Sequence, residues 1–444
     1  MKRPLNPIDE VFLSMGREPG LTHGQFLRFR GSPPPLAELR DHLVARLPGL
    51  PRLTYRTTTT SGRAYQVPSA CFDIRDHLRE EEFPAGTTLD EVLTALARLP
   101  LPRGGGPMWS LHLVHGYAPK EYAVCYRVHH STEDGMGAVH VVGSLFGDGT
   151  EPERTGRDDQ GPLFGACPDE LVRGTLSVGA GLVRGLLPVR RWPKAPEPRP
   201  GHLAVCSTTA TQRELGLLGQ RFGGTFNDAF LMALWGALAT WSATGEKGGV
   251  RSVFRASPVP VRMPLSTRRT GEEAAPGNHL TTAVVALPGQ GLRTDAAFAE
   301  LVDGTHRMRS RGLRPASRAL VALLPAALTR WTVRRLLSPR SSPLYASNYR
   351  QPKFLSFKGD PVIDAIPLGV LLPGNALSVT LLSCGSRVRV SFLYDRRLPG
   401  ADRLAALWRE ALDTLSAPSG PTAAATAPLT GTSTPSTHTK GPSC

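Results

Sequence analysis

Hydrophobic and polar residues recur along the first half of the chain with two different periods. Apolar residues at helical spacing, with a capping box at Thr88–Glu91, predict helices over residues 36–47, 88–99 and 138–145. Short apolar runs rich in β-branched and aromatic residues predict strands over residues 111–115 and 122–130. The first half therefore mixes helices with buried strands.

The second half of the chain repeats this mixture. Helical spacing of apolar residues predicts helices over residues 228–241, 295–309 and 402–415. Strand-like segments fall at residues 253–261, 280–287, 377–382 and 388–394. Because strands and helices are mixed in both halves, the pattern predicts an α/β fold with two domains of similar size.

Three segments lack the pattern of a packed core. A polar loop with Gly and Pro is expected over residues 147–168, and the proline-rich segment 188–201 is typical of a semi-rigid linker. The chain after residue 415 is mostly Ser, Thr, Pro, Ala and Gly, so we expect it to be disordered. The sequence therefore predicts an N-terminal domain over 1–187, a linker over 188–204, a C-terminal domain over 205–415 and a tail over 416–444.

The composition fits a protein with two hydrophobic cores. The chain has 444 residues, of which 40% are hydrophobic. Its six cysteines are scattered and form no C-x-x-C motif, which indicates a reducing compartment rather than a disulfide framework or a zinc site. The N-terminus lacks the apolar core of a signal peptide, and no run of about 18 apolar residues could span a bilayer. We therefore expect a cytoplasmic protein, with peripheral contact to the inner face of a membrane left open.

Positive charge is concentrated in one segment. Between Gly304 and Gly359 there is no carboxylate, whereas twelve Arg and Lys residues fall there and account for most of the formal charge of +15. Apolar residues interleave with the arginines over Arg307–Arg340, as on a basic amphipathic surface. Anionic lipid headgroups and the phosphates of coenzyme A both fit such a surface, and so does a plain solvated face. No nucleic-acid-binding motif accompanies the charge, so we expect no nucleic-acid partner.

The segment from His129 to Gly135 carries the strongest signal of chemistry. It follows an apolar strand and reads His-His-Ser-Thr-Glu-Asp-Gly. Adjacent residues of a strand point to opposite faces, so only one of the two histidines can face a given cavity. A neutral imidazole is well suited to take a proton from an alcohol or amine near pH 7. Apart from Asp134, no further metal ligand stands nearby at a suitable spacing, so a metal site is not expected.

This segment matches the H-H-x-x-x-D-G signature of acyltransferases related to chloramphenicol acetyltransferase and to peptide-synthetase condensation domains. Over roughly Leu5 to Leu415, the chain also resembles the bacterial wax ester synthase/diacylglycerol acyltransferase family. The blocks that carry this resemblance are Leu5–Leu13, Pro107–Trp109, Asn227–Asp228, Pro258–Arg262, Gly277–Asn278, Ser347–Asn348 and Tyr394–Arg396. Their collinear order is far more specific than any single motif.

The resemblance implies an α/β fold of two chloramphenicol-acetyltransferase-like subdomains, with mixed sheets flanked by helices and an active-site channel between them. It implies that His130 is the general base for direct attack of an acceptor hydroxyl on an acyl thioester, and that His129 supports it. Asp134 is expected in a structural ion pair, and Gly135 where a Cβ would clash. Acyl-CoA is then a co-substrate, and no cofactor is expected.

The resemblance also places substrate-binding residues along the chain. Asn227 is the best side-chain candidate to stabilise the tetrahedral oxyanion, although asparagine at a helix start is also a favoured N-cap. Trp109 is expected in the core or in the channel wall. The full set of expected substrate-binding residues is Trp109, Asn227, Asp228, Asn278, Ser347 and Asn348.

Some positions depart from the family pattern and bear on the acceptor. The departures lie at Ser131–Glu133, at His279 and at Tyr349–Pro352. They favour a hydroxylated acceptor that is more polar than a diacylglycerol or a long-chain alcohol. Two functions of different class stay open. One is an O-acyltransferase that forms triacylglycerol, wax ester or a related ester, including esters of specialised metabolites. The other is a condensation-type protein that forms amides or only binds.

Overall fold

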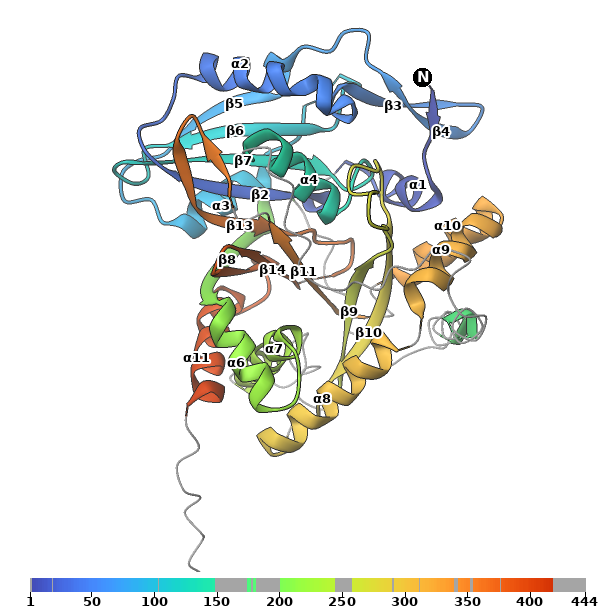
Figure 1. The fold of residues 1–444 in the computed structure, drawn as a ribbon, viewed down its shortest axis with the longest axis vertical. Coiled ribbons are helices and arrows are strands. Elements are labelled where there is room, and N and C mark those ends of the chain that lie inside the picture. Colours follow the sequence, from blue (N-terminus) through green and yellow to red (C-terminus); the bar gives the residue numbers. More distant parts are fainter. Residues whose placement is uncertain are drawn as a thin grey trace, which may run out of the picture.

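The chain forms two halves, each built on a six-stranded sheet, with the N-terminal half at the top of Figure 1. The computed structural model describes residues 2–417 except 18, 103, 148–173, 177–178, 181–199, 244–257, 290, 311, 339–341, 352–353 and 376. Both sheets contain parallel and antiparallel neighbours, and helices flank them. The predicted α/β class with mixed sheets is confirmed.

The N-terminal sheet has the strand order β12-β13-β2-β7-β6-β5. Its own strands are β2 (Thr22–Arg30), β5 (Leu78–Glu82), β6 (Trp109–His115) and β7 (Glu121–His129). The helices that pack on it are α2 (Leu36–Arg46), α3 (Leu89–Arg98) and α4 (Gly135–Phe146). Beside them stand α1 (Pro7–Ser14) and a small sheet of β1 (Arg3–Pro4), β4 (Arg63–Pro68) and β3 (Tyr55–Thr60).

Strand β7 lies in the middle of this sheet and is apolar on both faces. One face carries Val124 and Tyr126, which join the core that contains α2 and α4 residues. The other carries Ala123 and Cys125, which join the core that contains α3 residues. Successive side chains of a strand point to opposite faces, so a strand covered on both sides reads as a continuous apolar run. This run ends at the two histidines.

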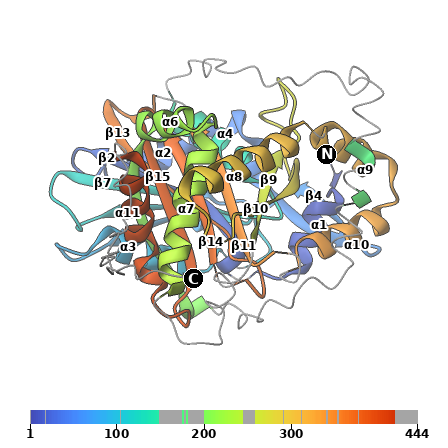
Figure 2. The same ribbon diagram turned by 90° about the horizontal axis from the view of Figure 1, so that it is seen from below.

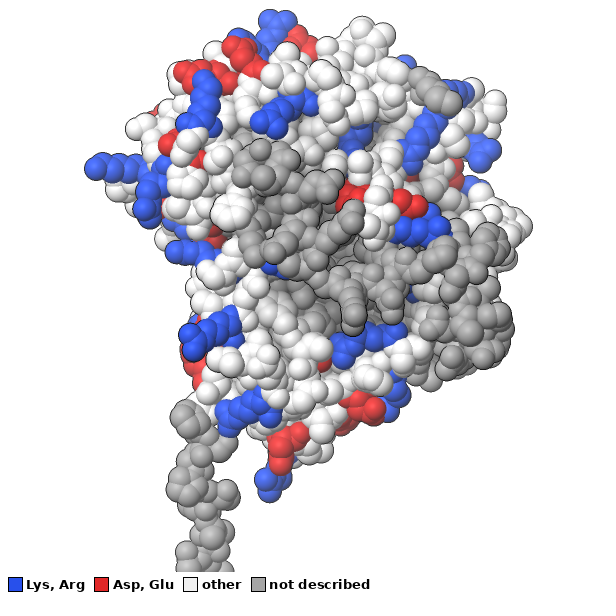
Figure 3. All heavy atoms as spheres, viewed as in Figure 1, with Lys and Arg blue, Asp and Glu red and all other residues white. Residues whose placement is uncertain are grey.

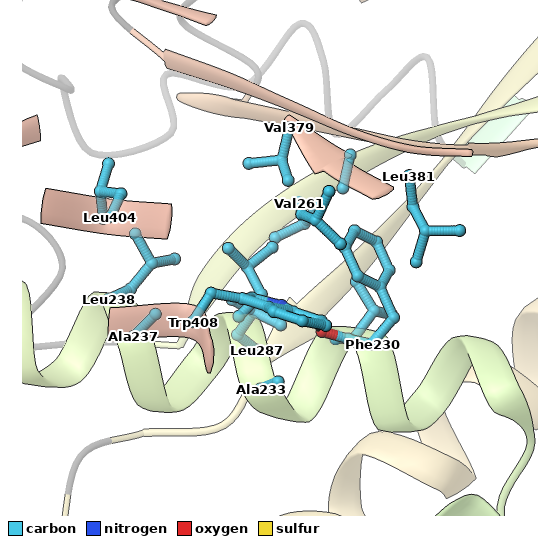
Figure 4. Close-up of a cluster of buried hydrophobic side chains, with 14 of the residues drawn as sticks. Phe230, Ala233, Ala237, Leu238, Val261, Leu287, Val379, Leu381, Leu404 and Trp408 are labelled. Atoms are coloured by element: carbon cyan, nitrogen blue, oxygen red, sulfur yellow. The ribbon is translucent and has the colours of Figure 1, made fainter. Parts of the chain in front are cut away.

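The C-terminal sheet has the strand order β10-β9-β11-β14-β15-β8. These strands are β8 (Leu203–Thr211), β9 (Val259–Ser266), β10 (Leu280–Leu287), β11 (Leu344–Gln351), β14 (Leu377–Cys384) and β15 (Arg387–Asp395). Figure 2 shows the helices over this sheet, which are α6 (Gln212–Arg221), α7 (Phe226–Ala243), α8 (Thr294–Arg309) and α11 (Leu404–Ser416). Trp408 of α11 and Phe230 of α7 pack against sheet residues such as Val261 and Leu381 (Figure 4).

One hairpin from the second half of the chain joins the N-terminal sheet. Strands β12 (Ser356–Phe357) and β13 (Asp360–Leu368) come from the second half of the chain, yet β13 pairs antiparallel with β2. Asp364 of β13 is buried and forms ion pairs with Arg28 of β2 and Arg389 of β15, so it joins both sheets. The predicted domain boundaries need this correction, because residues 356–368 belong to the N-terminal sheet.

Most predicted helices and strands are present within a few residues of the expected bounds. The helix expected from residue 138 begins at Gly135 instead, because the Asp134 side chain caps it by accepting from the Gly137 backbone N–H at 2.9 Å. The strand expected over 253–261 is described only from Val259 and continues to Ser266. The loop over 148–168, linker residues 188–199 and the tail after 417 lie outside the described residues.

The basic stretch contains helices α9 (Leu313–Leu323) and α10 (Ala326–Leu336). Two arginines of α10 contact helix α1: Arg330 pairs with Glu10 at 2.6 Å, and Arg334 donates to Ser14 at 3.1 Å. On the face drawn in Figure 3, Lys and Arg are spread over both halves with acidic residues among them. Across the described residues, no helix is both long and apolar enough to cross a membrane.

Candidate active site

A cavity of about 1520 Å³ is lined by residues of both halves. Its lining mixes apolar side chains with many polar and charged ones. The N-terminal half contributes Phe12, His23, His130, Gly135 and Val139, and the C-terminal half contributes Asn227, Met263, Ser347, Asn348 and Thr380. The position of this cavity agrees with the channel predicted between the halves.

His130 lies just past the end of β7 and faces this cavity. Its ring stacks on the ring of Phe12 with 4.1 Å between centroids, and the ring of His23 lies 4.7 Å away. Its backbone N–H donates to the carbonyl of Leu21 at 2.9 Å. The Nδ1 atom of His130 is buried, and no hydrogen-bond partner for it stands among the described residues. Nε2 is therefore the ring nitrogen left to meet a ligand.

The environment of His130 favours a neutral ring. Burial lowers the pKa of the imidazole below its usual value, and the nearby carbonyl of the same residue and the carboxylate of Asp134 oppose this only in part. A neutral imidazole keeps a lone pair that can accept a proton at pH 7. The residue is thus suited to act as a general base.

His129 is turned away from the cavity and locked in place. Its Nε2 lies 2.9 Å from the carbonyl oxygen of Gly16, so this nitrogen must carry the proton and donate. Its Nδ1 accepts from the backbone N–H of Ser131 at 3.1 Å. Burial lowers the pKa of His129 to about 4. The predicted division between the two histidines is confirmed in position: one faces the cavity, and the other anchors the turn.

Asp134 forms the predicted ion pair, and its partner is Arg268. Its Oδ1 accepts from the Gly137 N–H, and its Oδ2 accepts from Arg268 and from the His279 backbone N–H at 2.9 Å. Burial would raise the pKa of Asp134, but the charge of Arg268 and these hydrogen bonds outweigh it and lower the pKa. An ionised carboxylate with both oxygens occupied is a structural group rather than a proton relay.

The sequence predicted that a Cβ at residue 135 would clash with its surroundings, and this prediction is wrong. A Cβ at Gly135 would meet the Tyr349 ring at 3.6 Å, which is ordinary van der Waals contact. The tight position is Gly137, where a Cβ would lie 2.9 Å from the Cβ of Glu133. The first turn of α4 therefore folds closely over the preceding turn at Gly137.

Asn278 supports His130 from behind and is not among the residues that line the cavity. Its Nδ2 donates to the His130 carbonyl at 2.5 Å and to Asp9 Oδ1 at 2.8 Å, and its backbone N–H donates to the same Asp9 oxygen at 2.8 Å. Burial raises the pKa of Asp9 to about 7, although the bonds from Asn278 oppose the shift. The substrate-binding role predicted for Asn278 is therefore corrected to a positioning role.

Asn227 lines the cavity at the start of α7 and is not the cap of that helix. The cap is Thr225: the Asp228 backbone N–H donates to its Oγ1 at 3.4 Å, and its own backbone N–H donates to Asp228 Oδ2 at 2.8 Å. Asn227 Oδ1 accepts from Asn348 Nδ2 at 3.4 Å, and Asn348 also lines the cavity. The side chain of Asn227 is thus available to a ligand.

Two other predicted substrate-binding residues do not reach the cavity. Asp228 is fully buried and accepts from Thr225 and Thr305, which makes it a helix-capping residue. Trp109 lies in the N-terminal core and donates from Nε1 to the Leu53 carbonyl at 2.7 Å. Neither lines the cavity, so Asp228 is corrected to a structural role, and Trp109 occupies the core, which was one of the two places expected for it.

The polar residues at 131–133 also have structural partners. Ser131 bonds to His129, and Glu133 accepts from the Tyr126 hydroxyl at 2.5 Å beside Arg52. Neither residue lines the cavity. Their polarity therefore gives no support to a polar acceptor, and the expectation that residues 131–133 favour one is corrected.

His23 is a site residue that the sequence did not reveal. It stands on β2, lines the cavity beside His130, and its Nε2 lies 2.9 Å from the Glu133 carbonyl, to which it must donate. Burial lowers the pKa of His23 to about 3, so it stays neutral. No motif surrounds it in the sequence, and only the pairing of β2 with β7 brings it to the site.

Two family models match successive parts of the chain. Residues 5–275 match the "Wax ester synthase/diacylglycerol acyltransferase catalytic domain", and residues 277–416 match the "WS/DGAT C-terminal domain". A Mycobacterium tuberculosis protein named "Putative diacylglycerol O-acyltransferase" is 26% identical over 382 residues, which cover 75% of this chain and 74% of that protein. A second relative from the same organism, named "Probable diacylglycerol O-acyltransferase", is 22% identical over 437 residues, which cover 88% and 90%.

Solved structures share the fold at low sequence identity. The wax ester synthase/diacylglycerol acyltransferase of Marinobacter aquaeolei VT8 superposes with a TM-score of 0.64 at 19% identity and covers 93% of this chain and 98% of that chain. A starter condensation domain of rhizomide synthetase, solved in complex with C8-CoA, gives a TM-score of 0.62 at 15% identity and covers 94% of both chains. The predicted fold is confirmed by these likenesses.

Replacement of Asp134 by Asn should destabilise the protein. The change leaves Arg268 buried without its counter-charge, which costs about 3–5 kcal/mol of unfolding free energy. Chemical denaturation followed by circular dichroism measures the loss. Glu272→Gln is the matched control, because it breaks the more exposed pair with Arg318 and should cost at most about 1 kcal/mol. Equal stability of Asp134→Asn and wild type would contradict a structural role for this pair.

Replacement of Asp9 by Asn should flatten the pH dependence of stability. Because burial raises the pKa of Asp9 to about 7 in the folded protein, folding favours its protonated form. The contribution of Asp9 to the free energy of unfolding is present in full below its pKa in the unfolded chain, which is near 4. This contribution is lost as the pH rises to about 7. Melting temperatures between pH 4 and 8 should fall more steeply in wild type than in Asp9→Asn. Identical slopes in the two proteins would show that Asp9 does not titrate in this range.

Proposed function

Because the chain belongs to the wax ester synthase/diacylglycerol acyltransferase family, we propose that it is an acyl-CoA-dependent O-acyltransferase that forms an ester. The observation that carries this proposal is the position of His130. Its ring lines a large cavity, and burial lowers the pKa of the ring, which favours the neutral form. Direct attack of a bound hydroxyl on a bound thioester needs this arrangement.

In the proposed reaction, the acceptor hydroxyl gives its proton to Nε2 of His130 while its oxygen attacks the thioester carbonyl. The tetrahedral intermediate then collapses, the C–S bond breaks, and the thiol of coenzyme A leaves with the proton that His130 held. The acyl group passes directly to the acceptor without an acyl-enzyme. A positioned base of this kind contributes about 10²–10⁴-fold in rate.

Asn227 is the proposed donor to the oxyanion. It lines the cavity at the first turn of α7, and Thr225 rather than Asn227 caps that helix. Its Oδ1 is held by Asn348, and no partner for its Nδ2 group stands among the described residues. An amide N–H fixed in this way stabilises negative charge that develops on the carbonyl oxygen.

Arginines at the cavity are the proposed site for the phosphates of coenzyme A. Arg309, Arg314 and Arg350 of the basic stretch line the cavity, as do Arg46 and Arg269. Arg330 and Arg334 of α10 instead contact helix α1, so they are poorly placed for a ligand in the cavity. One feature supports contact with an anionic membrane or lipid droplet. Leu323 of α9 and Trp331 of α10 are large apolar side chains that are exposed.

Replacement of His130 by Ala should lower kcat by about 10²–10⁴-fold, because the general base is lost. His129→Ala should keep a larger residual rate, since His129 anchors the turn and does not face the cavity. Release of coenzyme A, followed with a thiol reagent in the presence of an acyl-CoA and mixed alcohols, measures the rates. Mass spectrometry of the product identifies the ester, and an equimolar amine in the same assay tests the condensation-type alternative.

The outcome that would overturn the mechanism is a wild-type kcat in His130→Ala. Formation of amide in preference to ester would favour the condensation-type function. Binding of substrates without any turnover by the wild-type protein would favour a role as a binding module.

The double replacement Arg314→Gln and Arg350→Gln should raise KM for acyl-CoA. It should leave KM unchanged for the acyl-pantetheine thioester, which lacks the nucleotide phosphates. Arg330→Gln is the control, because it breaks the pair with Glu10 outside the cavity. A double variant that keeps the wild-type KM for acyl-CoA but no longer sediments with anionic vesicles at low salt would favour the membrane role instead.

A further inference from the structure

A buried general base must become a cation in the middle of the reaction. In the proposed transfer, Nε2 of His130 takes the proton of the acceptor hydroxyl, so the ring is an imidazolium until the proton leaves with coenzyme A. Burial opposes this charged form and lowers the pKa of the ring. The rate therefore depends on the groups that stabilise a positive charge on His130.

The carboxylate of Asp134 favours the charged form of His130, but its hydrogen bonds are made elsewhere. Its Oδ1 accepts from the Gly137 N–H, and its Oδ2 accepts from Arg268 and from the His279 backbone N–H. Arg268 also pairs with this carboxylate and opposes its charge. Because these bonds occupy both oxygens, Asp134 does not serve as a hydrogen-bonded counter-ion of the imidazolium.

The other ionisable neighbours of His130 bring no negative charge into contact with its ring. The rings of His23 and His129 are neutral, because burial lowers their pKa to about 3 and about 4. Asp9 bonds to Asn278, and Asn278 donates to the His130 carbonyl rather than to its ring. Stabilisation of the imidazolium by contact must then come from an uncharged group.

The ring of Phe12 lies directly against the imidazole. The two rings are nearly parallel, with 4.1 Å between centroids and 8° between planes. Phe12 is 3% exposed and lines the cavity together with His130. The face of an aromatic ring carries negative charge, so it attracts a cation within about 6 Å, most strongly where water is excluded. Phe12 thus presents a negative face to the ring that becomes charged.

Helix α1 holds Phe12 in this position before any reaction. Asn6 caps the helix by accepting from two backbone N–H groups of its first turn. Glu10 ties the helix to α10 through the ion pair with Arg330 at 2.6 Å. Phe12 itself packs in a buried cluster with Ile8, Val11, Leu21, Leu337 and Leu372. A stabilising group that is fixed in advance costs no reorganisation during the reaction.

We propose that Phe12 is a positioning residue that stabilises the imidazolium of His130 through a cation–π contact. The Phe12 ring exchanges no atom or electron. The proton still passes from the acceptor hydroxyl to Nε2 and then to the sulfur of coenzyme A. In a Ser-His-Asp triad, a carboxylate bonded to the histidine has this task. The inference rests on the proposed acyl transfer and adds a residue to its mechanism.

The test replaces Phe12 by pentafluorophenylalanine, which keeps the shape of the ring but reverses the charge of its face. The kcat should fall about 5- to 30-fold, as expected for loss of a cation–π contact in a desolvated site, while KM for acyl-CoA stays close to wild type. The acid limb of kcat/KM should move to lower pH, because a less stable imidazolium has a lower pKa. Phe12→Leu should have the same effects, with an additional loss of thermal stability from poorer packing.

Phe29 provides a matched control. It stacks on Tyr122 with 5.0 Å between centroids and 5° between planes. It is fully buried in the N-terminal core and does not line the cavity. Phe29→Leu should lower the melting temperature as Phe12→Leu does. Pentafluorophenylalanine in place of Phe29 should leave both kcat and the acid limb as in wild type.

A wild-type kcat and an unmoved acid limb with pentafluorophenylalanine in place of Phe12 would overturn the proposal, and so would an equal fall in kcat from the same change at Phe29. NMR titration of His130 without substrates separates this inference from the proposed function, because it needs no turnover. If wild type forms no ester, but the fluorinated ring at Phe12 lowers the pKa of His130, the acyltransferase proposal fails and the cation–π contact stands. An unchanged pKa of His130 would overturn the contact, whatever the effect on the rate.

Discussion

The turn that carries His130 is held by a segment of the other half, residues 268–279. Arg268 neutralises Asp134 in the buried ion pair, and Asn278 donates to the carbonyl of His130. The Gly277 backbone N–H also donates to the Thr132 carbonyl at 3.1 Å. A base must be held within a fraction of an ångström of its working position, and these contacts fix the backbone of the turn. The geometry of the site therefore depends on the two halves staying together.

A second constraint is the low polarity around the imidazoles. Phe12 stacks on His130, and three histidines stand together within the same buried region. Burial lowers the pKa of each of them, so none needs a counter-charge at neutral pH. The other two rings, those of His23 and His129, carry their proton on Nε2. Each donates a hydrogen bond from this nitrogen to a backbone carbonyl. For Nδ1 of His130 no such partner stands among the described residues, and its ring lines the cavity together with the ring of His23.

Local sequence patterns predicted the elements but only part of the site. The sequence predicted three local features, because each depends on neighbours in sequence: the apolar run of β7, the capping box at Thr88 and the histidine pair. The Thr225–Asp228 cap follows the same local rule and would have shown that Asp228 is structural. The bond between Asp9 and Asn278 joins residues 269 positions apart, and β13 crosses to the other half. His23 likewise reaches the site only through strand pairing, so no local pattern could reveal these three features.

The role of His130 as a neutral base is tested most directly by the pH dependence of kcat/KM for the acceptor, measured in wild type and in Asp9→Asn. The rate should rise as the free imidazole loses its proton. Because burial lowers the pKa of His130 from its ordinary value of 6.5, the acid limb should have an apparent pKa below 6.5 in both proteins. An acid limb at or above 6.5, or one that disappears in Asp9→Asn, would contradict that role.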